Sequence, residues 1–357
     1  MRCLRGMRAA AIIGLSLCLH GCPRPVDESW MGWVPGTGMG WCETAMPRGT
    51  MEPQLIAANI ELLGNALPLR WISPNAHVYE LDAVTLAISD LGDEDHVKGP
   101  LWDDHDWYRT RCFELCDNRS SFGIPLGIER IDRVTGERVR LARGSYGIAD
   151  VALAGDYVYW GLFAHETGGG VERVKKSGGA DERIELRTAS DEDQVTHLAT
   201  YPGGLLVLGW DSIGWIPSAG KPRTIATGLR SNAAVLDDDI VFTADAGGSS
   251  FPNGCIRRIS LLDGSNTTLA GTPRAPSAIA TYGPNVYFTL ASASEIWAVP
   301  KSGGLARVVL KPRPRTPCDE PMELWATERG LLWTDGQALD LQRSLYFAPW
   351  ASLTAGA

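Results

Sequence analysis

One short phrase recurs along most of this chain and limits what it can fold into. An apolar strand with an aromatic residue is followed by a second strand, and then by a small glycine-rich turn. The two clearest copies run from Val158-Tyr159-Trp160 to Lys176-Ser177-Gly178-Gly179, and from Val286-Tyr287-Phe288 to Lys301-Ser302-Gly303-Gly304. A repeat of this kind cannot bury its own faces alone, so it predicts similar sheets stacked around a common axis.

The spacing of the copies predicts four-stranded antiparallel blades. The apolar second strands begin at 158, 205, 240, 286 and 331, which gives steps of 47, 35, 46 and 45 residues. A propeller blade takes about 40 to 50 residues, so 357 residues fit one domain. We therefore expect an all-β chain, a β-propeller over residues 53–357.

Each blade is expected to hold four consecutive strands. First strands are expected at 148–153, 195–200, 233–236, 277–281 and 323–327; third strands at 213–216, 256–259 and 296–299; and fourth strands at 223–226 and 307–310. A more divergent unit upstream has its second strand within 101–108, and its third and fourth at 128–131 and 138–141.

The number of blades depends on how the two ends of the chain meet. Leu345 to Ala348 has the pattern of a third strand, but no clear fourth strand follows it. A strand from the N-terminal part, at 55–60 or 69–72, would close the ring and give six blades. Seven is the alternative, if 53–95 form a blade of their own. Residues 55–67 also have a composition compatible with a helix.

The N-terminus has the features of an export signal. Arg2, Arg5 and Arg8 precede an apolar stretch from Ala9 to Leu19, which is too short to span a bilayer as a mature helix. Leu19-His20-Gly21-Cys22 then resembles the bacterial lipobox, although His20 departs from the usual small or aliphatic residue. We expect a signal peptide over 1–21, lipidation of Cys22 and a tether to residue 52, so that the protein is held at the cell membrane or outer membrane.

The charge of the mature chain makes some partners unfavourable. The full chain carries a formal net charge of −9, and loss of the three signal arginines leaves 30 bases against 42 acids, or about −12. An acidic surface repels phosphate backbones and anionic headgroups, so nucleic acid is not an expected partner and the lipid is the expected anchor. We expect a monomer.

Cysteine usage agrees with an oxidising compartment. Cys112 and Cys116 lie four residues apart, and a local bridge between them is the first hypothesis. Cys255 with Cys318, or Cys42 with either of these, would join one blade to another. These five cysteines cannot all pair internally.

The repeated strands carry a resemblance to a known family. Leu332-Trp333-Thr334-Asp335 nearly reproduces the YWTD motif of six-bladed propellers, and Val158-Tyr159-Trp160-Gly161 and Val286-Tyr287-Phe288-Thr289 are weaker versions. Over about 77–350 the chain resembles exported bacterial propeller lipoproteins of the YWTD/NHL-like type, which have no assigned activity. These motifs are structural, so the resemblance transfers no catalytic residue.

Two groups of side chains are candidates for a site. Asp103, Asp104, His105 and Asp106, with a similar group at 93–96, are the candidates for calcium or another divalent ion, with a solvated acidic loop as the alternative. The inner strands are mostly apolar, and their polar exceptions or neighbours are the candidate ligand-binding residues: Asp150, Asn232, Glu323, Asp193 and His197.

Two classes of function follow. The favoured hypothesis is a binding or scaffolding module that needs no cofactor and holds an envelope protein, peptide or glycan on rim loops or a channel face. The alternative is a metal-assisted hydrolase, lactonase or lyase with carboxylates around a central ion. The chain has no G-x-S-x-G elbow, and its glycine-rich stretch at 168–170 lacks the lysine and helix of a phosphate loop.

Overall fold

The structure is a computed structural model, and its described residues form an all-β protein. Described are residues 53–62, 69–72, 77–93, 101–112, 126–142, 148–162, 170–184, 186, 194–246, 253–291, 293, 295–311, 320–336 and 343–353. The predicted signal peptide, Cys22, Cys42 and the tether lie outside them. Within these ranges α2 (Trp350–Leu353) is the single helix, and none is long and apolar enough to cross a bilayer.

Five antiparallel sheets have four strands each, taken from consecutive stretches of the chain. They are β5 (Leu101–Trp102), β6 (Asp106–Cys112), β7 (Leu126–Asp132) and β8 (Arg138–Ala142); β9 (Ile148–Ala154), β10 (Tyr157–Leu162), β11 (Gly170–Lys175) and β12 (Glu182–Ile184); β13 (Val195–Tyr201), β14 (Gly204–Gly209), β15 (Ser212–Pro217) and β16 (Arg223–Thr227); β17 (Ser231–Asp237), β18 (Ile240–Asp245), β19 (Cys255–Ser260) and β20 (Asn266–Gly271); and β21 (Pro276–Tyr282), β22 (Asn285–Leu290), β23 (Ile296–Pro300) and β24 (Arg307–Leu310).

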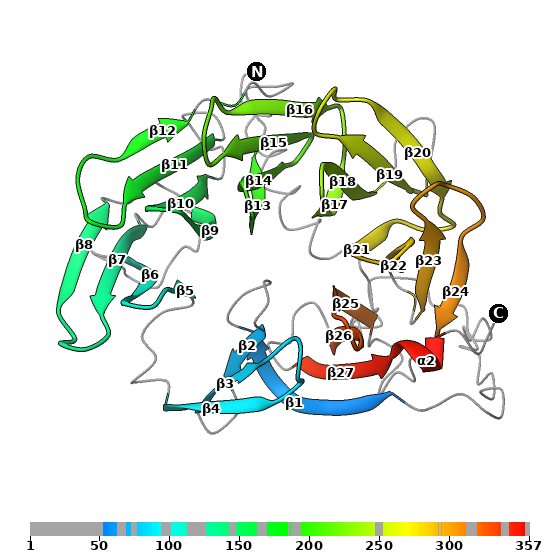
Figure 1. Cartoon of the computed structure of the whole chain (residues 1–357), viewed down its shortest axis with the longest axis horizontal. Coiled ribbons are helices and arrows are strands. Elements are labelled where there is room, and N and C mark those ends of the chain that lie inside the picture. Colours follow the sequence, from blue (N-terminus) through cyan, green and yellow to red (C-terminus); the bar gives the residue numbers. More distant parts are fainter. Residues whose placement is uncertain are drawn as a thin grey trace, which may run out of the picture.

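The sheets follow one another around an arc, with the first strand of each on the inside and the fourth outside (Figure 1). The first, second, third and fourth strands predicted between 148 and 334 are confirmed. In the upstream unit the predicted third and fourth strands are confirmed as β7 and β8. The predicted second strand at 101–108 is divided, because β5 and β6 form a hairpin that turns between Trp102 and Asp106.

The remaining strands form one seven-stranded sheet that contains the first and the last described strands. Its order is β25 (Glu320–Ala326), β26 (Gly330–Gly336), β27 (Arg343–Pro349), β1 (Gln54–Leu62), β2 (Leu69–Ile72), β3 (His77–Leu81) and β4 (Ile88–Asp93). Leu55 pairs with Tyr346, and Leu62 pairs with Trp71. The strand predicted from 55–60 is therefore present, and the helical alternative for this segment is wrong.

Aromatic and aliphatic side chains of the second strands fill the spaces between neighbouring sheets. Trp160, Phe288 and Trp333 are at most 1% exposed. Five of the six core clusters draw on two successive sheets, and one of these combines Tyr108 of β6 with Trp160 of β10. The sixth lies within the seven-stranded sheet described above and joins its β2 and β3 to β25, β26 and β27. Burial of such side chains contributes about 1.5–3 kcal/mol each, so contacts between sheets are a main source of stability.

The two ends of the sheets differ in how their strands are joined. Because the strands alternate in direction, first-to-second and third-to-fourth turns lie at one end, which we call the tight-turn end. Several of these turns have only two residues, as at 155–156, 238–239 and 283–284. The opposite end, which we call the connector end, joins strands through longer segments such as 113–125, 185–194 and 311–319.

One tight turn carries an aspartate where its counterparts carry glycine. Asp238 has a φ of 52°, and Gly155 and Gly283, at the same place in their turns, have φ values of 54° and 53°. The left-handed conformation is unfavourable for a residue with a Cβ atom. We expect Asp238→Gly to raise the free energy of unfolding by about 0.5 kcal/mol, as the released strain exceeds the entropy that glycine adds to the unfolded chain.

Urea denaturation measures this difference. Asp239→Gly, at the next residue, is the matched control, because Asp239 is not in the left-handed region. It should lower stability. A loss of stability in both variants would contradict the assignment of strain to Asp238.

Candidate functional site

Two of the predicted inner-strand residues meet at the connector end. Asp150 of β9 and His197 of β13 lie on neighbouring first strands, and Asp150 Oδ2 is 2.7 Å from His197 Nδ1. Asp150 Oδ2 also accepts a hydrogen bond from the backbone N–H of Leu198 at 2.8 Å, and Oδ1 accepts one from the N–H of Val151 at 2.8 Å. Asp150 Oδ2 therefore joins β9 to β13 of the next sheet, while Oδ1 is held within β9.

These contacts fix the chemistry of the imidazole. An ionised carboxylate has no proton to donate, so the 2.7 Å contact with Asp150 Oδ2 favours the tautomer in which His197 Nδ1 carries the proton. In the neutral ring, Nε2 then bears the lone pair, which a ligand N–H or O–H group can use. The His197 side chain is 30% exposed, which leaves room for such a contact.

The other two described candidates are engaged in protein contacts. Asn232 of β17 donates from Nδ2 to the carbonyl of Pro276 in β21, at 2.8 Å, and so joins another pair of first strands. Glu323 of β25 lies 2.5 Å from Arg343 Nη1 and accepts a hydrogen bond from Thr334 Oγ1 at 3.1 Å. The structure brings together Asp150 and His197, and it places Asn232 and Glu323 apart from them on other sheets. Asp193 lies outside the described residues.

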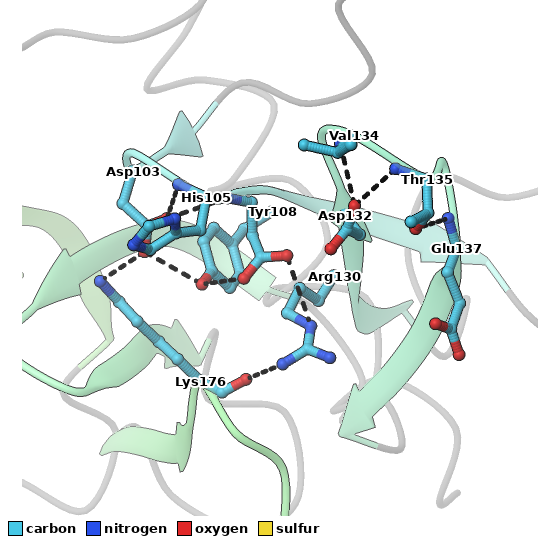
Figure 2. Close-up of polar contacts among 10 residues, drawn as sticks. Asp103, His105, Tyr108, Arg130, Asp132, Val134, Thr135, Glu137 and Lys176 are labelled. Atoms are coloured by element: carbon cyan, nitrogen blue, oxygen red, sulfur yellow. Dashed lines mark hydrogen bonds and ion pairs between the residues drawn. The ribbon is translucent and has the colours of Figure 1, made fainter.

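The predicted metal loop has a different role (Figure 2). Asp103 Oδ1 accepts the backbone N–H groups of His105 and Asp106, both at 3.0 Å, and so holds the turn between β5 and β6. Its Oδ2 lies 2.8 Å from Lys176 Nζ and accepts the Tyr108 hydroxyl at 3.1 Å. The carboxylate thus has its partners within the protein, as in a structural turn.

The side chains of Asp104 and His105 do not form a group of metal ligands with the Asp103 carboxylate, and both residues are exposed. Among the described residues no group of three or more His, Cys, Asp or Glu side chains is arranged to hold a metal ion. Glu94, Asp95 and His96, from the second acidic group, lie outside those residues.

The surroundings of Asp103 shift two pKa values. Burial tends to raise the pKa of Asp103, but the hydrogen bonds from Lys176 and from the N–H groups of His105 and Asp106 outweigh it and lower the pKa from 3.8 to about 2. Burial and the negative charge of Asp103 raise the pKa of Tyr108 above its ordinary value. Tyr108 is therefore neutral and donates its hydroxyl proton.

This shift predicts how stability depends on pH. Because the folded-state pKa of Asp103 is depressed, its ionic contacts contribute fully above pH 3.8 and are lost as pH falls towards 2. We expect Lys176→Met to destabilise the protein at pH 5 and to differ little from wild type at pH 2. Urea denaturation at several pH values tests this.

The matched control is Lys221→Met, at an exposed lysine in the turn between β15 and β16. Its effect should not change over the same range. A Lys176→Met penalty that stays constant from pH 5 to pH 2 would contradict the assigned role of the ion pair.

Sequence reasoning missed a buried ion pair at the connector end. Asp245, at the end of β18, is 3% exposed; its Oδ1 accepts the Ser231 hydroxyl at 2.6 Å, and its Oδ2 lies 2.5 Å from Arg257 Nε. Nearby Cys255 is a buried free thiol, whose pKa is raised by burial and by the charge of Asp245. Its predicted partners, Cys42 and Cys318, lie outside the described residues, so a bridge through Cys255 stays a prediction.

Other predicted cysteines are not tested here. Cys116 and Cys318 lie outside the described residues, as does the side chain of Cys112.

Sequence reasoning also missed Trp210, which lies in the short connector between β14 and β15 at the connector end. It is 47% exposed, and its backbone N–H donates to the carbonyl of Gln194 at 2.8 Å.

Comparisons with known proteins add little. No protein-family model and no curated protein matches the chain. Among solved structures it is similar to the computationally designed protein Ika8, with a TM-score of 0.45, 12% identity and coverage of 84% of this chain and 98% of that one.

Two natural proteins are also similar. The extracellular domain of BT4673 from B. thetaiotaomicron has a TM-score of 0.48 and 12% identity, over 83% of this chain and 40% of that one. The apo form of AztD from Citrobacter koseri has a TM-score of 0.45 and 16% identity, over 67% and 68%. Likenesses this distant carry no conclusion about activity or partner.

Proposed function

We propose that this protein is an exported, lipid-anchored β-propeller that binds a partner of the cell envelope at its connector end. The observation that carries the proposal is the chemistry presented there. His197 offers a polar atom on an innermost strand, held in one tautomer by Asp150, and Trp210 offers a large exposed aromatic surface. Binding faces commonly combine aromatic anchors with a few oriented polar groups on a rigid scaffold.

We further propose that the ring has seven sectors and not the six favoured by sequence spacing. The seven-stranded sheet divides naturally into β25, β26, β27 and β1 as one sector and β2 to β4 as the next. In support, Arg329, in the first-to-second turn of the first of these sectors, donates to the carbonyl of Thr85, in the turn between the last two strands of the next, β3 and β4. The Asp103–Lys176 pair joins the same two kinds of turn in successive sheets.

The contacts of the polar inner residues favour binding over metal-assisted hydrolysis. A central ion would need ligand atoms from several sheets. Asp150, Asn232 and Glu323, the best candidates from the sequence, each use their side chains to hold strands together. Among the described residues, His197 Nε2 and Asn232 Oδ1 have no hydrogen-bond partner, so both stay available to a ligand.

The anchor is tested through Cys22. In a bacterial host, wild-type protein should enter the membrane fraction and the detergent phase, and Cys22→Ala should not. Cys42→Ala is the matched control and should behave like wild type. A Cys22→Ala variant that remains in the membrane fraction would contradict lipid anchoring at this residue.

The binding face is tested by photo-crosslinking in the envelope of intact cells. A photoreactive amino acid replaces Trp210 at the connector end or, as control, Leu262, which is 73% exposed in the turn between β19 and β20 at the tight-turn end. We expect discrete crosslinked species from position 210, and their loss when His197→Ala is added. Crosslinks from position 262 alone would contradict the proposal.

A further inference from the structure

Two equivalent sites between neighbouring sheets, both at the tight-turn end, differ in one important respect. The first, which we call the closed site, consists of Asp106, Tyr108, Arg130 and Lys176. The second, which we call the open site, consists of Ile240, Phe242, Arg258 and Lys301. In each, three residues belong to one sheet and the lysine belongs to a sheet beside it in the arc (Figure 1).

The strand register shows that the two sites correspond. Tyr108 pairs with Arg130 across β6 and β7, and Phe242 pairs with Arg258 across β18 and β19. Two residues earlier, the second strands begin with Asp106 and with Ile240. Both lysines open a Lys-Ser-Gly-Gly turn, and each ion-pairs with an aspartate of the other sheet's first turn, Lys176 with Asp103 and Lys301 with Asp237.

In the closed site the arginine has partners within the protein (Figure 2). Arg130 Nε lies 3.7 Å from Asp106 Oδ1, and Nη1 donates to the carbonyl of Lys176 at 2.8 Å. The Tyr108 hydroxyl lies against Asp103 at 3.1 Å. The internal carboxylate of Asp106 therefore occupies the space beside the guanidinium.

In the open site that internal carboxylate is absent. Ile240 stands where the closed site has Asp106, and Phe242 stands where it has Tyr108, so neither can hydrogen-bond to the arginine. Arg258 is exposed, and its guanidinium makes no hydrogen bond or ion pair with another described residue. A hollow of about 440 Å³, open to solvent, is lined by Ile240, Phe242, Arg258 and Lys301 together with Asp237, Asp238 and Ser302.

We propose that the open site binds the carboxylate of a small organic acid that carries an apolar group. The ligand carboxylate takes the position beside Arg258 that the Asp106 carboxylate takes beside Arg130. A guanidinium presents its N–H groups in a planar fork that matches a carboxylate. Ile240 and Phe242 form the apolar wall for the rest of the ligand, and the volume suits a small molecule. This site is separate from the connector end, so it stands independently of the proposed function.

The proposal is tested with N-acetyl-L-phenylalanine as the probe. Its primary amide, N-acetyl-L-phenylalaninamide, is the uncharged control ligand, and binding to the full chain is measured by isothermal titration calorimetry. Because hydrogen bonds to charged groups contribute about 1.5–3 kcal/mol, we expect the acid to bind at least about tenfold more tightly than the amide.

Two variants remove this preference by different routes. Arg258→Gln removes the guanidinium, whereas Ile240→Asp leaves it in place and supplies the internal partner that the closed site has. Arg138→Gln, at an exposed arginine of β8, is the control and should keep the preference. Thermal unfolding confirms that each variant is folded. An equal affinity of wild type for acid and amide, or a preference retained in Arg258→Gln or Ile240→Asp, would overturn the proposal.

Discussion

Replacement of Gly330 by alanine is expected to lower the free energy of unfolding by about 3 kcal/mol, the upper range for overpacking a buried site. Gly330 begins β26, directly opposite Pro349 of β27. A Cβ atom added there would lie 2.1 Å from the carbonyl oxygen of Ala348 and 2.8 Å from Phe347 Cε2. The nearer contact is backbone, so relief requires the two strands to separate.

The matched control for Gly330 is Gly170→Ala. Gly170 is also buried and also begins a strand, but its added Cβ would first meet the flexible end of Arg183, at 3.4 Å. We expect a change of less than about 1 kcal/mol, as for a tolerated Gly-to-Ala substitution. Urea denaturation measures both variants. Equal effects of the two substitutions would contradict the close approach of β26 and β27.

Replacement of Arg257 by methionine is expected to lower the free energy of unfolding by about 3 kcal/mol, because it leaves one member of a buried ion pair without its counter-charge. The Asp245 side chain is 5% exposed, and the Arg257 side chain, whose Nε lies 2.5 Å away, is 26% exposed, so water replaces the guanidinium only in part. The Ser231 hydroxyl remains as a donor to the carboxylate, but it is neutral.

A second substitution separates charge from packing. In Arg257→Met with Asp245→Asn, no unpaired charge is buried, and the stability should recover by more than half. Denaturant midpoints of the single and double variants give this comparison. A double variant that is no more stable than Arg257→Met alone would show that lost packing of the Arg257 stem causes the effect.

The repeat in the sequence was sufficient to predict most of the strands. The second strands are apolar segments, several with a large residue such as Trp160 or Phe288, and most tight turns contain Gly, Asp or Asn; the turn at 327–329 is an exception. These signals lie within each stretch of sequence, so they predict where a strand begins and ends without information about the sheets that pack against it. The sequence after β27 has no pattern of a fourth strand, which indicated that another part of the chain must pair with β27. In the structure that part is β1.

Contacts between sheets could not be predicted in the same way. Asp150 and His197 are separated by a whole repeat, and Asp245 and Arg257 by a connector, so their meeting depends on the register and on the bulges at the start of the first strands. The acidic group at Asp103 was interpreted as a metal candidate because composition does not reveal that Lys176 lies beside it. Arg258 became informative only when its equivalence to Arg130 was known.

The first and the last described strands, β1 and β27, lie side by side in one sheet, and β1 joins β27 to β2. Hydrogen exchange of the full chain tests this pairing. We expect the amides of β1 that pair with β27, such as those between Gln54 and Ile60, to exchange as slowly as their β27 partners. Exchange of β1 at the rate of an unfolded segment, while β27 remains protected, would contradict it.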